Sequence, residues 1–176
     1  MKLPRVPSRT TPGFAFSMVK RALQDCLARR RFGQKEMADV MSFFGTDEPE
    51  CMFCGSRDVK RWDHLVPINN DGETVLGNMV PACARCDDSK QHLPFEEWMT
   101  SDAKHSPKSR GVKDVDQRIA RIKAYVQRFG YRVQPLHERL SEQERQRLSE
   151  IDSKLQKIRE EVDALIADYR GRTGHT

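Results

Sequence analysis

Two Cys-x-x-Cys pairs, Cys51/Cys54 and Cys83/Cys86, stand 28 residues apart. Four thiolates from two tight turns can complete a tetrahedral zinc site and leave no open position for chemistry. A hairpin and a loop fit in the gap, so the metal would join the two ends of a small element. Disulfides and unrelated free thiols are the alternatives, but paired Cys-x-x-Cys is a specific zinc signal. The polar segment 1–5 contains no apolar secretory leader that would favour disulfides.

The segment between the pairs predicts two strands and a helix. Residues 59–62 form a short β-rich run that leads into Asp63-His64, and Pro67 ends the strand because it cannot donate to a ladder. Asn69–Gly72 is dense in turn residues. The chain then returns through residues 77–81, and a short helix is expected from residue 84 onward.

This arrangement resembles the zinc-containing branch of the HNH endonucleases. That family's ββα-metal motif reads Cys-x-x-Cys, Asp-His, Asn, and Cys-x-x-Cys-His/Asn-x-x-Lys, and residues 51–98 follow it in order. The resemblance implies that His64 is the general base and that Asp63 is a ligand of the catalytic divalent metal. It also implies that Asn78 holds the loop and orients the base through its amide.

One position departs from the family pattern. The residue after the last cysteine is usually His or Asn, and here it is Asp87. A carboxylate is a good hard-oxygen ligand, so Asp63 with Asp87 suits Mg²⁺ or Mn²⁺, and Asp88 is the substitute ligand. Lys90 matches the family's lysine, which lies near the scissile phosphate or packs.

Charge is unevenly placed along the chain, whose net charge is +5. Residues 1–35 hold nine basic residues and one acidic residue (+8), and residues 101–140 hold ten and four (+6). Residues 51–100 hold five and eight (−3). An acidic metal site needs basic flanks to hold a polyanion, so we expect DNA contacts there, with Arg29, Arg30 and Arg31 the leading candidates. A solvated charged surface is the other interpretation.

Apolar spacing predicts helices on both sides of the motif. An extended basic arm (1–13) precedes helices at 17–31 and 35–44, which form a helix-turn-helix or, the preferred interpretation, a cap on the motif. Cys26 is expected to be a buried small residue. After a short helix at 94–99, residues 101–112 look like a flexible basic linker.

The C-terminal part predicts two helices, at 114–129 and after a capping box that begins at Ser141. The second helix carries a heptad stripe of apolar residues: Leu148, Ile151, Leu155, Ile158, Val162, Leu165 and Tyr169. Helix 114–129 is too short to cover the whole stripe. The N-terminal helices or a second chain must cover the rest, so a helical hairpin and a coiled-coil homodimer both remain open.

Together these features predict an α+β, mostly helical protein with a small zinc-stapled ββα-metal core. We expect three segments: a basic arm and helical cap (1–45), the nuclease module (46–100), and a basic linker with C-terminal helices (101–176). The expected function is metal-dependent cleavage of double-stranded DNA, and the alternative is a zinc-stabilised nucleic-acid-binding module without catalysis. No long apolar run suggests a membrane span, so a soluble, cytoplasmic protein is expected.

Overall fold

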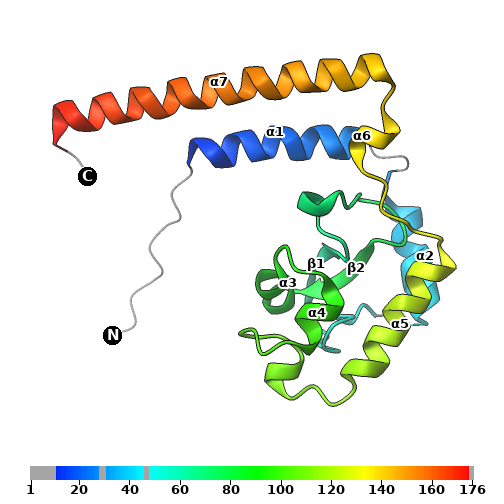
Figure 1. The fold of residues 1–176 in the computed structure, drawn as a ribbon. Helices are drawn as coiled ribbons and strands as arrows, with labels where there is room; N and C mark the ends of the chain where they lie inside the picture. Colours follow the sequence, from blue (N-terminus) through cyan, green and yellow to red (C-terminus); the bar gives the residue numbers. More distant parts are fainter. Residues whose placement is uncertain (1–10, 28–30, 46–47, 175–176) are drawn as a thin grey trace. The chain divides into compact units, whose positions relative to one another are not determined.

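The computed structural model describes residues 11–27, 31–45 and 48–174, which form two compact units. The central unit comprises residues 24–136, and the terminal unit combines the described residues within 1–23 and 137–176. The fold is α+β and mostly helical, as the sequence predicts (Figure 1). No helix in the described ranges combines the length and apolarity that a bilayer crossing requires.

A two-stranded antiparallel sheet lies at the centre of the central unit. β1 (Val59–His64) pairs with β2 (Met79–Cys83), so that His64 lies opposite Met79 and Val59 opposite Cys83. The register shifts between residues 59 and 61. A loop that contains the short 3₁₀ helix η1 (Ile68–Asn70) joins the strands, and α3 (Ala84–Lys90) follows β2 directly. The predicted strand–loop–strand–helix order is therefore confirmed.

Three further helices enclose this sheet in one hydrophobic core: α2 (Gln34–Phe44), α4 (Phe95–Thr100) and α5 (Val115–Arg128). The largest apolar and aromatic side chains within it are fully buried: Phe44, Phe53, Leu65, Trp98, Met99, Ile122 and Tyr125. The second predicted N-terminal helix thus packs on the motif as a cap. Each such side chain contributes about 1.5–3 kcal/mol by leaving water, which offsets the small size of the sheet.

α5 also holds the loop between the strands. The buried Tyr125 hydroxyl donates to the Met79 carbonyl at 2.9 Å and accepts from the Gly77 amide at 2.8 Å. Gly77 has φ +93°, and a Cβ there would lie 2.6 Å from the Tyr131 Cβ, so only glycine fits. These contacts fix the backbone immediately before Asn78.

The segment predicted to be a flexible linker is ordered instead. It contains the 3₁₀ helix η2 (Lys108–Arg110), and Ser106 is fully buried. The Ser106 hydroxyl donates to the Ser101 carbonyl at 2.7 Å and accepts from the Ser109 amide at 3.1 Å. Serine side chains can replace backbone hydrogen bonds in such turns, which explains why a polar composition was misleading.

The terminal unit consists of α1 (Pro12–Cys26) up to Leu23, most of α6 (Leu136–Arg139), and α7 (Glu142–Thr173). α7 begins at the predicted capping box, where the Ser141 hydroxyl accepts from the Glu144 amide. α1 begins five residues earlier than predicted, because Pro12 occupies the first helical position, where proline is favoured, and the Thr11 hydroxyl accepts from the Phe14 amide. Cys26 is exposed, so its expected burial was wrong.

The compact units differ from the predicted three segments. α2 and α5 share one core with the cysteine motif through Phe44, Ile122 and Tyr125, so the central unit extends on both sides of 46–100. α5 therefore buries its apolar face in the central unit. Within the terminal unit the neighbour of α7 is α1, since Lys20 Nζ lies 3.1 Å from Asp152 Oδ1.

Candidate functional site

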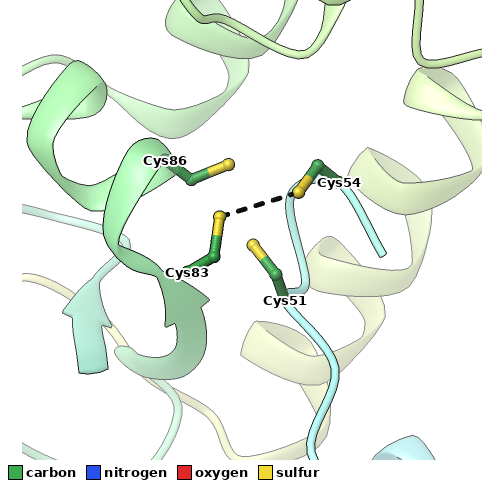
Figure 2. Close-up of side chains that lie close together, drawn as sticks. All are labelled: Cys51, Cys54, Cys83 and Cys86. Atoms are coloured by element: carbon green, nitrogen blue, oxygen red, sulfur yellow. Dashed lines mark hydrogen bonds between the residues drawn. The ribbon is translucent and has the colours of Figure 1, made fainter. Parts of the chain in front are cut away.

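The four paired cysteines converge on one point (Figure 2). Their Sγ atoms all lie within 4.8 Å of one another, and Cys54 Sγ is 3.8 Å from Cys83 Sγ. The first pair lies in a tight turn that closes when the Gly55 amide donates to the Cys51 carbonyl at 2.8 Å, and Gly55 has φ +73°. The second pair comes from the last residue of β2 and the first turn of α3. The cluster therefore joins the turn before β1 to the junction between β2 and α3.

This cluster fits a tetrahedral zinc ion. Thiolates about 2.3 Å from zinc lie roughly 3.8 Å from one another, which matches the Cys54–Cys83 distance. All four thiols are free rather than joined in disulfides. The hydrogen bond between the Cys51 and Cys54 side chains raises the pKa of Cys51 to about 12 and lowers the pKa of Cys54. Thiols so close cannot all ionise without a cation between them, which a metal would supply.

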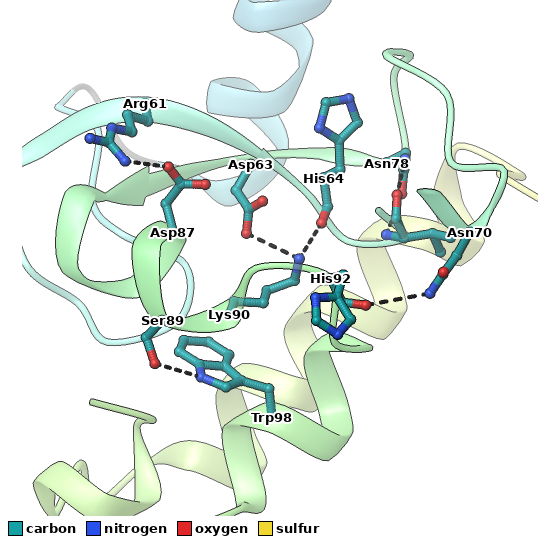
Figure 3. Close-up of polar contacts among 11 residues, drawn as sticks. Arg61, Asp63, His64, Asn70, Asn78, Asp87, Ser89, Lys90, His92 and Trp98 are labelled. Atoms are coloured by element: carbon teal, nitrogen blue, oxygen red, sulfur yellow. Dashed lines mark hydrogen bonds and ion pairs between the residues drawn. The ribbon is translucent and has the colours of Figure 1, made fainter. Parts of the chain in front are cut away.

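A buried ion pair joins the end of β1 to α3 (Figure 3). Lys90 in α3 is fully buried, and its Nζ lies 3.3 Å from Asp63 Oδ2 and donates to the His64 carbonyl at 2.6 Å. Asp63 Oδ2 is itself buried and accepts no hydrogen bond from any described residue. Burial raises the pKa of Asp63 to about 6, although the Lys90 charge opposes that shift. An oxygen so placed can accept a further cation.

His64 follows Asp63 and carries a partly exposed imidazole. Its Nε2 lies 2.9 Å from the Thr74 hydroxyl, in the loop between the strands. Lys90 fixes the His64 backbone, and Thr74 contacts the ring. Thr74 was not predicted as a neighbour of His64, because a single hydroxyl in a loop belongs to no recognisable spacing pattern.

Asn78 is fully buried and holds the loop between the strands. Its Oδ1 accepts from the Val66 amide at 2.8 Å, and its Nδ2 donates to the carbonyls of Val66 at 3.0 Å and Glu73 at 2.8 Å. Both ends of the loop are thereby tied to one side chain. The amide contacts the backbone of Val66, just after His64, rather than the imidazole.

Asp87 lies in the first turn of α3, and after burial and the Lys90 charge, the Asp87 charge also influences the pKa of Asp63, by raising it. Its Oδ2 accepts from Arg61 Nη1 at 2.6 Å, and the same nitrogen contacts Asp88. Asp87 is partly buried whereas Asp88 is exposed. Asp87 is therefore the better-placed carboxylate toward Asp63, and Arg61 is a neighbour that the motif did not predict.

The residues expected to contact nucleic acid differ in their exposure to solvent. Arg31 is exposed, while Arg29 and Arg30 lie outside the described residues. Lys90 cannot contact a phosphate from its position, because its ammonium is buried between Asp63 and the His64 carbonyl. The other role considered for this lysine, packing, is the one that the structure supports.

Comparison with known proteins agrees with this geometry. Residues 51–93 match the family "HNH endonuclease". Over 66 residues the chain is 30% identical to "SPbeta prophage-derived putative HNH endonuclease YoqL" of Bacillus subtilis (strain 168). That alignment covers 38% of this chain and 25% of the relative, so the chain spans about a quarter of the relative's length. No solved structure matches.

Proposed function

We propose that this protein is a metal-dependent endonuclease that hydrolyses double-stranded DNA, and the match of residues 51–93 to the HNH endonuclease family supports this proposal. One observation carries the proposal. The adjacent residues Asp63 and His64 end β1 beside Asp87 at the start of α3, and the cysteine cluster and Asn78 hold both elements in place.

The chemistry assigned to each residue follows from its position. His64 takes a proton from the attacking water, and its partly exposed ring can reach solvent. Asp63 and Asp87 supply hard carboxylate oxygens that would hold Mg²⁺ or Mn²⁺. When bound, such a cation stabilises the charge that develops on the phosphoryl and leaving oxygens. Zinc on the four cysteines has only a structural role, since a tetrathiolate site has no open position.

The DNA is proposed to lie against basic residues outside the motif. The net charge of −3 over residues 51–100 repels a polyanion, whereas residues 1–35 and 101–140 are strongly basic. Of the three arginines proposed to contact DNA, Arg31 lies within the described residues. It is exposed and lies just before α2.

A second function rests on the cations that already contact the two carboxylates. Lys90 pairs with Asp63 and Arg61 pairs with Asp87. If these pairs persist, the site cannot hold a divalent metal, and the protein would bind nucleic acid without cutting it.

Incubation of the purified protein with supercoiled plasmid separates these functions. We expect nicked or linear product when Mg²⁺ or Mn²⁺ is added, and none in metal-depleted buffer. Single-stranded DNA and RNA of equal length test the substrate class. Retarded plasmid with no product at any metal concentration would favour the non-catalytic module.

Cation affinity at the Asp63 site should depend on pH. Because burial raises the pKa of Asp63 to about 6, the carboxylate is ionised above that pH and protonated below it. A cation must displace the proton, so Mn²⁺ affinity should fall by roughly tenfold per pH unit below about 6.

Calorimetric titration of Mn²⁺ between pH 5 and pH 8 measures this dependence. It measures binding rather than cleavage, so the pH dependence of a histidine base in the reaction does not enter. Asp63→Asn, which keeps the shape but not the charge, should bind weakly at every pH. An affinity that does not change between pH 5 and pH 7 would exclude Asp63 as a ligand.

A further inference from the structure

α7 presents an apolar stripe that is exposed within its own unit. Ile151, Ile158 and Leu165 occur every seventh residue, and their exposed fractions are 41%, 48% and 68%. Tyr169 continues the stripe at 54% exposure. Isolated exposed apolar residues are ordinary, but a continuous heptad stripe on a 32-residue helix is typical of helix–helix association.

α1 covers only one side and one part of this helix. It runs antiparallel to α7, since Lys20 pairs with Asp152 whereas Gly13 lies near Arg159. Phe16 lies with Leu155 at this contact. The 15 residues of α1 span about 22 Å and the 32 residues of α7 about 48 Å. Beyond Arg159, the structure shows no described segment that covers the stripe.

We propose that α7 pairs antiparallel with α7 of a second copy of this chain. The stripe then closes through three kinds of residue pair, each of which the twofold axis repeats. Leu148 meets Leu165 of the second copy, Ile151 meets Val162, and Leu155 meets Ile158. The twofold axis passes between Gln156 and Lys157, close to the middle of α7. α1 contacts the side of the stripe that carries Leu155, and leaves exposed the side that carries Ile151, Ile158 and Leu165.

The flanking charges select the antiparallel orientation. In the stated register Lys154 faces Glu161 of the second copy, and Arg147 faces Asp168, and the twofold axis repeats each pair. All four side chains are exposed. Neither Lys154 nor Glu161 forms an ion pair within the part of the chain that the structure describes. In a parallel pair, Lys154 would instead face Arg159, where like charges repel.

The test measures the mass of the full chain by light scattering and sedimentation at protein concentrations of about 1–100 µM, a range in which micromolar association is detected. We expect twice 20.4 kDa for the wild type. Leu165→Asp should give a single chain whose melting temperature no longer depends on protein concentration, since this side chain is 68% exposed within its own unit and packs only in the pair. A single-chain mass for the wild type throughout the range would overturn the proposal.

Charge reversal decides the orientation. Lys154→Glu and Glu161→Lys should each weaken dimerisation by roughly fivefold or more, and the double variant should restore it. Lys157→Glu, on the exposed face outside the seam, is the matched control and should leave the dimer unchanged. A stronger dimer for Lys154→Glu would indicate a parallel pair and refute the antiparallel one. None of these readouts depends on the proposed nuclease activity.

Discussion

Replacing His64 by alanine should reduce plasmid cleavage by roughly 100-fold to 10,000-fold, the usual contribution of a general base. The substitution removes the imidazole but keeps the His64 carbonyl, which accepts from Lys90 at 2.6 Å. The buried Asp63–Lys90 pair and the cysteine cluster should therefore persist. Zinc content, melting temperature and DNA affinity are expected to match the wild type while single-turnover cleavage is lost.

Two other histidines provide controls for this experiment. His137 is exposed and lies in the terminal unit, so His137→Ala should retain full activity. His92 is exposed near the site, and only its backbone carbonyl has a described contact, with Asn70 at 3.4 Å. If His92→Ala lost cleavage and His64→Ala kept it, the base would be His92 and the proposed mechanism would fail.

The cysteine cluster was predictable because its chemistry is encoded in local spacing. Two residues between thiols fix each turn, and the position of the motif's Asp-His and Asn residues between the pairs determines the order of strands and helix. Asn78 was likewise assigned to the loop, and the structure gives it three hydrogen bonds to the loop backbone. Features that depend on such local spacing can therefore be predicted from the sequence.

Lys90 shows what local spacing cannot predict. A lysine is usually exposed, and its motif position suggested a phosphate contact. Its burial depends on tertiary partners, Asp63 and the His64 carbonyl, which lie 26 or 27 residues away in sequence. The ordered segment 101–112 is a similar case. There Arg110 donates to Cys86 Sγ at 3.0 Å, and such a contact cannot be predicted from amino-acid composition.

The packing of α5 was missed for a related reason. Its apolar spacing correctly predicted a helix, but the same stripe could pack on α7 or on the cysteine motif. The choice depends on Tyr125, whose ring packs against Phe44 with centroids 5.2 Å apart and whose hydroxyl bonds the loop before Asn78. Periodicity identifies which face of a helix is buried, but not the element that buries it.

Loss of one cysteine should unfold the central unit. Cys51 is fully buried, and Phe53 between the first two cysteines packs on Trp98 with ring centroids 5.3 Å apart. Structural zinc contributes about 10–16 kcal/mol of apparent binding free energy, which equals or exceeds the 5–15 kcal/mol net stability of a typical domain. Cys51→Ser leaves three sulfur ligands and should reduce zinc from one ion per chain to nearly none.

Tryptophan fluorescence reports on this unit alone, because both tryptophans of the chain, Trp62 and Trp98, lie within it. Trp98 is fully buried, so unfolding should shift the emission to longer wavelength, even if helical circular dichroism from α7 persists. Cys26→Ser is the matched control, since Cys26 is exposed and lies outside the cluster, and it should keep one zinc ion and native emission. Native emission from zinc-free wild-type protein would show that packing around Trp98, rather than the metal, holds the central unit together.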